Sequence, residues 1–98
     1  MYLGELIKSH REQEQLSQKI VADAIGVDVP MYSRMERGQR PIKKDQIKIL
    51  SNLLKIKEEE LYKYWVAEKV YNIVADEDNA SEIFNIVSDK IIPYNKIK

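Results

Sequence analysis

The stretch QKIVADAIGVDVPMYSRMERG, residues 18–38, decides the fold of this chain. It predicts two short amphipathic helices joined through Gly26, which can take the positive φ that ends a helix without a Cβ penalty. Ala22 is small, as required where the second helix crosses the first closely. The apolar wedge between the two helices is formed by Val21, Ile25, Val27, Tyr32 and Met35.

Polar residues beside this stretch mark where its helices begin. Ser17 is a good N-cap for a helix over 18–25, and Asp28 for a second helix that ends at Gly38. Pro30 lies in the first turn of that second helix, where its missing N–H costs nothing. This combination of spacing and caps is that of a helix-turn-helix unit, whose second helix reads the major groove of DNA.

Apolar residues recur at helical spacing in four further segments, and no strand-length alternation competes with them. The four additional helices are expected over residues 2–14, 43 or 44–54, 58–75 and 80–92. The last helix is expected to stop before Pro93, with a frayed tail over 93–98. The predicted fold class is all-α, a compact five-helix helix-turn-helix domain over 1–62 with C-terminal helices over 63–92.

The composition is that of one small globular domain, with 98 residues, 44% apolar and 33% charged. The absence of cysteine excludes disulfides and thiolate metal sites. No apolar run has membrane length and no signal pattern is present, so a cytoplasmic protein is expected. The net charge is zero, but residues 1–57 hold 11 Lys/Arg against 7 Asp/Glu, and residues 58–98 hold 5 against 9. This asymmetry fits a basic half that faces DNA, although random scatter would also allow it.

Several short motifs carry a resemblance to a known family. They are LSQ at 16–18, IGV at 25–27, SRMERG at 33–38, RP at 40–41 and LSNLLKIKEEEL at 50–61. With the spacing above, these motifs make residues 3–62 resemble the Xre family of Cro- and phage-repressor-like transcription regulators. The stretches MERGQRPIKKDQI (35–47) and YKYWVAEKVYNIV (62–74) are similar to small controllers that accompany restriction-modification genes. Two assignments stay open: a generic regulator of the Xre family, or a member of this narrower controller subgroup.

Tyr32 departs from the pattern of the Xre family, because this wedge position usually carries a branched aliphatic residue. Two consequences are open: the ring tilts the reading helix slightly, or its hydroxyl reaches the surface.

The resemblance implies that the second helix of the unit lies in the major groove, with its N-terminal residues facing the base edges. By position, the base-contacting residues are Val29, Pro30, Ser33 and Arg34, with Met31 at the margin. Arg34 is expected to bond O6 and N7 of a guanine, the alternatives being a phosphate or an acid on its own helix. Val29 and Pro30 can offer only apolar contact, for example to a thymine methyl group.

Contacts to the DNA backbone are expected from the start of the first helix of the unit and from cations after the second. The predicted phosphate-contacting residues are Gln18, Arg37, Arg40, Lys43 and Lys44. A solvated face is the alternative for the basic cluster. The resemblance also implies that Glu36 is a buried acid that pairs with Arg11.

A homodimer on a palindromic site is expected, because one reading helix contacts too few base pairs for a unique site. Apolar residues beyond Leu61 exceed what one core needs. The predicted dimer interface is Trp65, Val66, Val70, Tyr71, Val74 and Phe84. Folding of both C-terminal helices back onto the core is the alternative.

These features predict a sequence-specific, double-stranded-DNA-binding transcription regulator, repressor or activator. The alternative is an antitoxin- or adaptor-type protein whose C-terminal helices bind another protein. The sole histidine, His10, is expected to be half-buried and structural. The sequence holds no catalytic constellation, so no enzyme activity is expected, and no metal, cofactor, membrane or small-molecule effector is indicated.

Overall fold

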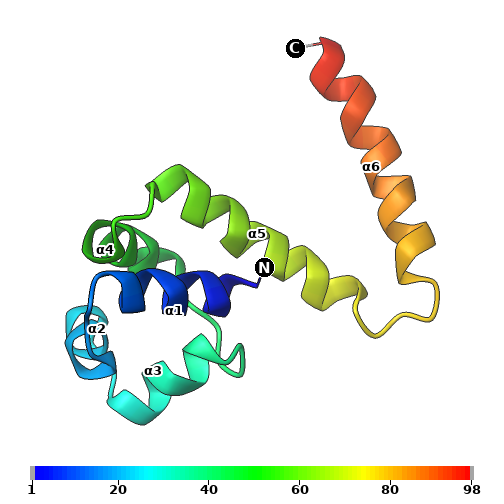
Figure 1. The fold of residues 1–98 in the computed structure, drawn as a ribbon. Helices are drawn as coiled ribbons and strands as arrows, with labels where there is room; N and C mark the ends of the chain where they lie inside the picture. Colours follow the sequence, from blue (N-terminus) through cyan, green and yellow to red (C-terminus); the bar gives the residue numbers. More distant parts are fainter. Residues whose placement is uncertain (1, 98) are drawn as a thin grey trace. The chain divides into compact units, whose positions relative to one another are not determined.

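The computed structural model describes residues 2–97, which form six helices joined by short connections (Figure 1). Their bounds are α1 (Leu3–Gln13), α2 (Gln18–Ile25), α3 (Val29–Glu36), α4 (Lys44–Leu54), α5 (Glu58–Val74) and α6 (Ala80–Ile97). No strand occurs among these described residues, so the all-α fold class is confirmed. The chain divides into two compact units, Met1–Glu68 and Lys69–Lys98.

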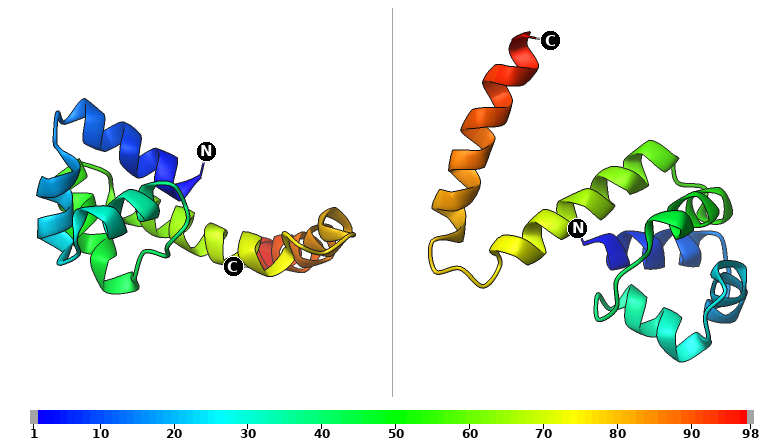
Figure 2. Two further views of the ribbon diagram at one scale, coloured as in Figure 1. Left: turned by 90° about the horizontal axis from the view of Figure 1, so that it is seen from below. Right: turned by 180° about the vertical axis from the view of Figure 1, so that it is seen from behind.

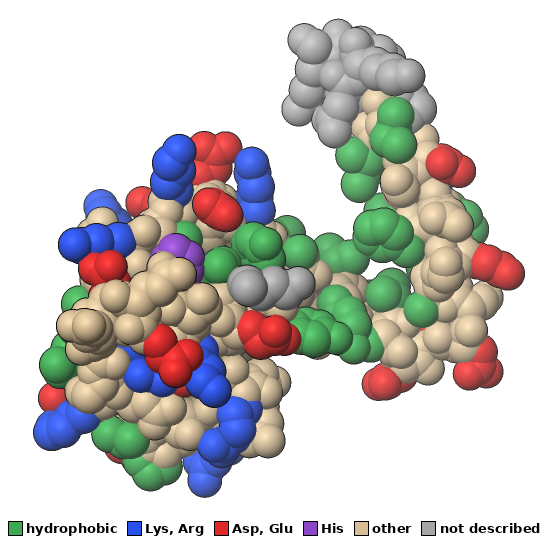
Figure 3. Space-filling view, viewed as in Figure 1, with side chains coloured by type: hydrophobic (Ala, Val, Ile, Leu, Met, Phe, Trp, Pro, Cys, Tyr) green, Lys and Arg blue, Asp and Glu red, His purple; other side chains and the backbone are tan. Residues whose placement is uncertain are grey.

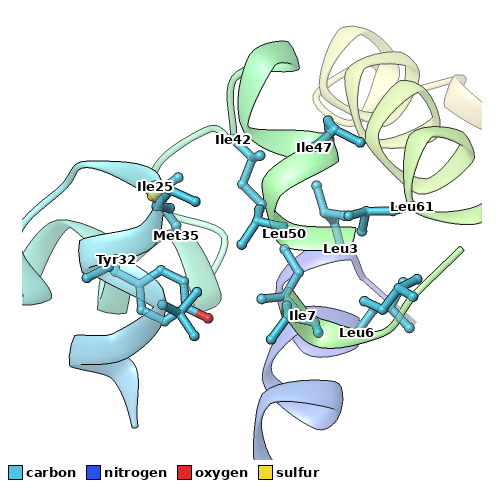
Figure 4. Close-up of a cluster of buried hydrophobic side chains, with 14 residues drawn as sticks. Leu3, Leu6, Ile7, Ile25, Tyr32, Met35, Ile42, Ile47, Leu50 and Leu61 are labelled. Carbon is cyan, nitrogen blue, oxygen red and sulfur yellow. The ribbon is translucent and has the colours of Figure 1, made fainter. Parts of the chain in front are cut away.

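The first unit encloses one hydrophobic core, to which α1 to α4 and the first turns of α5 contribute. Figures 1 and 2 show the helices of this unit from three sides. Val21 and Ala22 of α2 are completely buried, as are Leu50 of α4 and Leu61 of α5. Figure 4 shows part of this cluster, including Tyr32 from α3. The wedge predicted between α2 and α3 is therefore continuous with the core of the whole unit.

The predicted N-caps of α2 and α3 and the predicted end of α2 are confirmed, whereas α3 ends at Glu36, two residues before the predicted Gly38. Ser17 Oγ accepts a hydrogen bond from the Ile20 N–H at 3.2 Å, and Asp28 Oδ1 accepts one from the Met31 N–H at 2.8 Å. Gly26 ends α2 in the left-handed region with a φ of 75°. These local interactions fix the turn that sets α3 against α2.

Two close contacts between helices were not predicted from the sequence. A Cβ atom added to Gly4 of α1 would lie 2.2 Å from the carbonyl oxygen of Glu36, so glycine lets α1 approach the end of α3. In α4, the buried Gln46 donates from Nε2 to the Ile25 carbonyl oxygen at 3.5 Å, at the C-terminus of α2. Both contacts hold the helix-turn-helix unit against the helices that surround it.

The second unit contains the end of α5 and α6. The prediction that the last helix stops before Pro93 is wrong, because α6 runs to Ile97. A proline inside a helix removes one i→i−4 hydrogen bond and its ring crowds the carbonyl of residue i−4, but it can kink a helix instead of ending it, so helical turns can follow it. The fraying expected over 93–98 stays a prediction, and Lys98 lies outside the described residues. None of the described helices is long and apolar enough to cross a membrane.

The boundary between the units lies within α5, further along the chain than the boundary expected at residue 62. Tyr64 and Trp65 explain the difference, since both pack against the core of the first unit. The second unit has no comparable interior: from residue 69 to residue 92, no side chain is buried.

Candidate nucleic-acid interface

One face of α3 is exposed and carries all the predicted base-contacting residues. Val29, Pro30 and Arg34 are exposed and Ser33 is half-buried, whereas the opposite face is buried through Tyr32, Met35 and Glu36. The two sets alternate at helical spacing, so one side of α3 packs on the domain while the other faces solvent. Met31 is half-buried against the core, which agrees with its predicted marginal position.

The predicted phosphate-contacting cations follow this face along the chain. Arg37 and Arg40 lie in the connection after α3, and Lys43 and Lys44 lie at the start of α4; all four side chains are exposed. Figure 3 shows Lys and Arg side chains on the surface around α3. Contact between these side chains and phosphate groups stays a prediction.

Glu36 forms the ion pair with Arg11 that the resemblance implied. Arg11 Nε lies 2.6 Å from Glu36 Oε2, and Arg11 Nη2 donates to Oε1 at 3.2 Å, a bidentate pair that joins α1 to α3. Gln18 adds a third hydrogen bond, from Nε2 to Glu36 Oε1 at 3.1 Å. Arg11 also donates from Nη1 to the Leu16 carbonyl oxygen at 2.9 Å, which binds the α1–α2 connection to the pair.

These contacts keep the buried Glu36 carboxyl charged. Burial alone would raise its pKa, but the hydrogen bonds from Arg11 and Gln18 outweigh burial, and the pKa lies below its ordinary value. The hydrogen bond with Glu36 raises the pKa of Arg11 in turn. The pair therefore stays ionised across the physiological pH range.

The Gln18 amide connects this buried pair to the predicted DNA-binding surface. Gln18 is the first residue of α2 and is half-buried. An amide nitrogen carries two N–H groups, so the bond to Glu36 leaves a second donor for a phosphate. The helix N-terminus also favours a negative group there. The contact with Glu36 orients the Gln18 side chain and leaves one amide N–H group for the predicted phosphate contact.

Tyr32 is only 1% exposed, and its hydroxyl is buried without a hydrogen-bond partner of suitable geometry among the described residues. The alternative in which this hydroxyl reaches the surface is therefore wrong. The ring fills the wedge so deeply that its oxygen ends inside the domain, near the Arg11–Glu36 pair. Burial there raises the pKa of Tyr32, so the phenol stays neutral.

Arg34 has no competing partner within its own helix. The acid of α3 is Glu36, whose two oxygens bond Arg11 and Gln18. The alternative in which Arg34 pairs with an acid on α3 is thus not what the structure shows. The Arg34 side chain is exposed on the solvent face of α3, one turn along the helix from Pro30.

The comparison with known families agrees with this geometry. A helix-turn-helix family model matches residues 7–61, which is more than half of the chain and includes α2 and α3. The chain belongs to the Xre/Cro-like helix-turn-helix family. This is a family of DNA-binding regulatory domains. Searches of the curated proteins and of the solved structures gave no match.

The predicted dimer-interface residues of this helix-turn-helix protein differ in their surroundings. Trp65 is half-buried, and its Nε1–H donates to the Ile42 carbonyl oxygen at 2.6 Å, so the indole serves the core of its own domain. Val74 is half-buried. The remaining predicted interface residues are exposed: Val66, Val70, Tyr71 and Phe84. His10 is half-buried on α1, as expected.

Proposed function

We propose that this protein is a sequence-specific, double-stranded-DNA-binding transcription regulator that places α3 in the major groove of a palindromic operator. The observation that carries the proposal is the exposed face of α3, which presents Ser33 and Arg34 beside four exposed cations. The side chains on α3 would contact base edges, while the cations and the N-terminus of α2 would contact phosphates.

Arg34→Ala is expected to weaken binding to the preferred DNA site by about tenfold to hundredfold and to change the preferred sequence, because a bidentate guanidinium–guanine contact is lost. Sites selected from random DNA by the wild type and by the variant would be sequenced, and affinities measured by fluorescence anisotropy. Arg40→Ala is the control, expected to weaken all sequences alike. An unchanged selected sequence for Arg34→Ala would show that Arg34 does not read a base.

The proposed regulator acts as a homodimer through the C-terminal apolar surface, which we define as Val70, Tyr71, Ile73, Phe84, Ile86, Val87, Ile91 and Ile92. Each of these side chains is at least 36% exposed, with Ile73 at 76%. Large exposed apolar surfaces are characteristic of interfaces. Trp65 is better assigned to the monomer, because its indole bonds Ile42.

The double variant Val70→Asp/Phe84→Asp is expected to be monomeric under conditions where the wild type is a dimer, because two charges would be buried without partners. Sedimentation equilibrium measures both masses against the 11.5 kDa of one chain. The control is Ile49→Asp, an equally apolar exposed site on α4 that should leave the mass unchanged. Trp65→Asp is a poorer choice, since it would also damage the core.

A monomeric wild type would contradict the homodimer and favour the alternative, an antitoxin- or adaptor-type protein whose C-terminal helices bind another protein. The neighbouring genes test the narrower assignment. Adjacent methyltransferase and nuclease genes would support a restriction-modification controller, and an adjacent toxin gene would support the alternative.

A further inference from the structure

Arg37 makes a set of contacts that its predicted role as a phosphate-binding residue does not require. Its Nη1 donates to Ser33 Oγ at 2.8 Å, and its Nε donates to Gln39 Oε1 at 3.4 Å. Ser33 is one of the two polar residues on the reading face of α3. The guanidinium thus connects the reading face to the turn that follows the helix.

Backbone hydrogen bonds hold all three side chains in register. The Arg37 N–H donates to the Ser33 carbonyl oxygen at 3.2 Å, and the Gln39 N–H donates to the Arg34 carbonyl oxygen at 2.8 Å. Between them, Gly38 takes a φ of 74°, which turns the chain back toward the end of the helix. The contact between Arg37 and Ser33 therefore rests on a fixed backbone.

This contact determines what Ser33 can offer to DNA. A hydroxyl has one donor and two acceptor lone pairs, and here a cation occupies one lone pair. A charge-assisted bond to the oxygen polarises the O–H and makes its hydrogen a better donor. The positive charge beside the oxygen also disfavours a second donor approaching it. The Ser33 hydroxyl therefore acts as a hydrogen-bond donor toward any further partner.

We infer that Arg37 is a specificity-positioning residue, which orients Ser33 so that its hydroxyl donates to an acceptor on the base it faces. This inference rests on the proposed function, since it requires α3 to lie in the major groove. Guanine, adenine and thymine present acceptors there, whereas cytosine presents the N4 amino donor. The protein selects against cytosine on the strand that faces Ser33.

The test uses Arg37→Lys, because lysine keeps the charge but lacks the planar fork that reaches Ser33 and Gln39 together. In sites selected from random DNA, the wild type is expected to disfavour cytosine at one position by about threefold to tenfold, the range of a single hydrogen bond. Ser33→Ala should reduce this preference below about twofold, and Arg37→Lys should do the same at the same position. The double variant Ser33→Ala/Arg37→Lys should lose no more of the discrimination against cytosine than Ser33→Ala alone.

Binding to non-specific DNA distinguishes the positioning role of Arg37 from the contribution of its positive charge. Arg37→Lys should keep the wild-type salt dependence of binding to non-specific DNA, because the number of cations is unchanged. Lys48→Arg is the control, since Lys48 is an exposed cation on α4 outside both this set of contacts and the predicted DNA-contacting residues; it should alter neither property.

Two outcomes overturn the inference alone: a wild-type preference that survives in Arg37→Lys, or additive losses in the double variant. If Arg34→Ala changes the selected sequence in the same experiment, the proposed function still stands. If the wild type selects no sequence, the proposed function fails and this inference fails with it.

Discussion

Arg11→Met is expected to lower the free energy of unfolding by about 3 kcal/mol, because it leaves the Glu36 carboxylate buried without its ion pair. The Glu36 side chain is 3% exposed and that of Arg11 is 12% exposed, so the acid has less access to water. Glu36→Gln should therefore cost less, roughly 2 kcal/mol, because the orphaned guanidinium can be partly hydrated. Urea denaturation at neutral pH measures both values.

Lys19→Met is the matched control for this pair. Lys19 Nζ lies 3.0 Å from Asp23 Oδ2, but these side chains are 74% and 65% exposed. Losing such a surface pair should cost about 0.5 kcal/mol or less. Equal costs for Arg11→Met and Lys19→Met would contradict a special role for the buried pair.

The destabilisation caused by Arg11→Met is expected to be smaller at low pH than at neutral pH. In the wild type the folded pKa of Glu36 lies below its ordinary value of 4.5, so its contribution to stability is present above that pH. The contribution is lost as the pH falls through the folded pKa. Without Arg11, burial is expected to raise the pKa of Glu36 in the folded state above its ordinary value. The charged carboxylate would then destabilise the fold at neutral pH instead of stabilising it. The difference in free energy of unfolding between wild type and variant should therefore decrease as the pH falls from 7 to 4.

Gly4→Ala is expected to destabilise the protein by about 3 kcal/mol, although alanine normally favours a helix over glycine by about 1 kcal/mol. The added methyl would meet the Glu36 carbonyl oxygen at 2.2 Å and its carbon at 2.8 Å, and backbone atoms cannot move aside cheaply. The methyl would push α1 from the end of α3. Thermal and urea unfolding measure the loss.

The control for this prediction is a pair of variants at Glu5, the exposed neighbour of Gly4 on α1. Glu5→Ala should be more stable than Glu5→Gly, because only helix propensity differs between them. If alanine also proves better than glycine at position 4, the close approach of α1 to α3 does not occur in solution.

The local part of the fold could be predicted from the sequence because short-range chemistry determines it. Ser17 and Asp28 cap the helices as predicted, and Gly26 adopts the positive φ that its position requires. The exposed face of α3 also follows from helical spacing. The Arg11–Glu36 pair was implied by the family resemblance, since residue types alone do not identify partners so far apart in the chain.

Contacts that depend on how helices approach one another could not be predicted. A glycine at position 4 gives no sign of what lies against it, and the bond from Gln46 to Ile25 requires α4 to end up beside α2. The depth of the Tyr32 ring depends on the width of the whole wedge. The Arg37–Ser33 contact is different: its one-turn spacing on a helix is a signal that the sequence contains.

The convergence of Arg11 and Gln18 on Glu36 has a thermodynamic consequence for DNA binding. One carboxylate holds α1, α2 and α3 together, so the predicted phosphate contact at the start of α2 and the reading face of α3 belong to a single rigid body. The entropy of ordering these groups is lost during folding rather than on binding. Under the proposed function, the domain would meet DNA pre-organised, and its sequence preference would reflect the fit of one fixed surface to the groove.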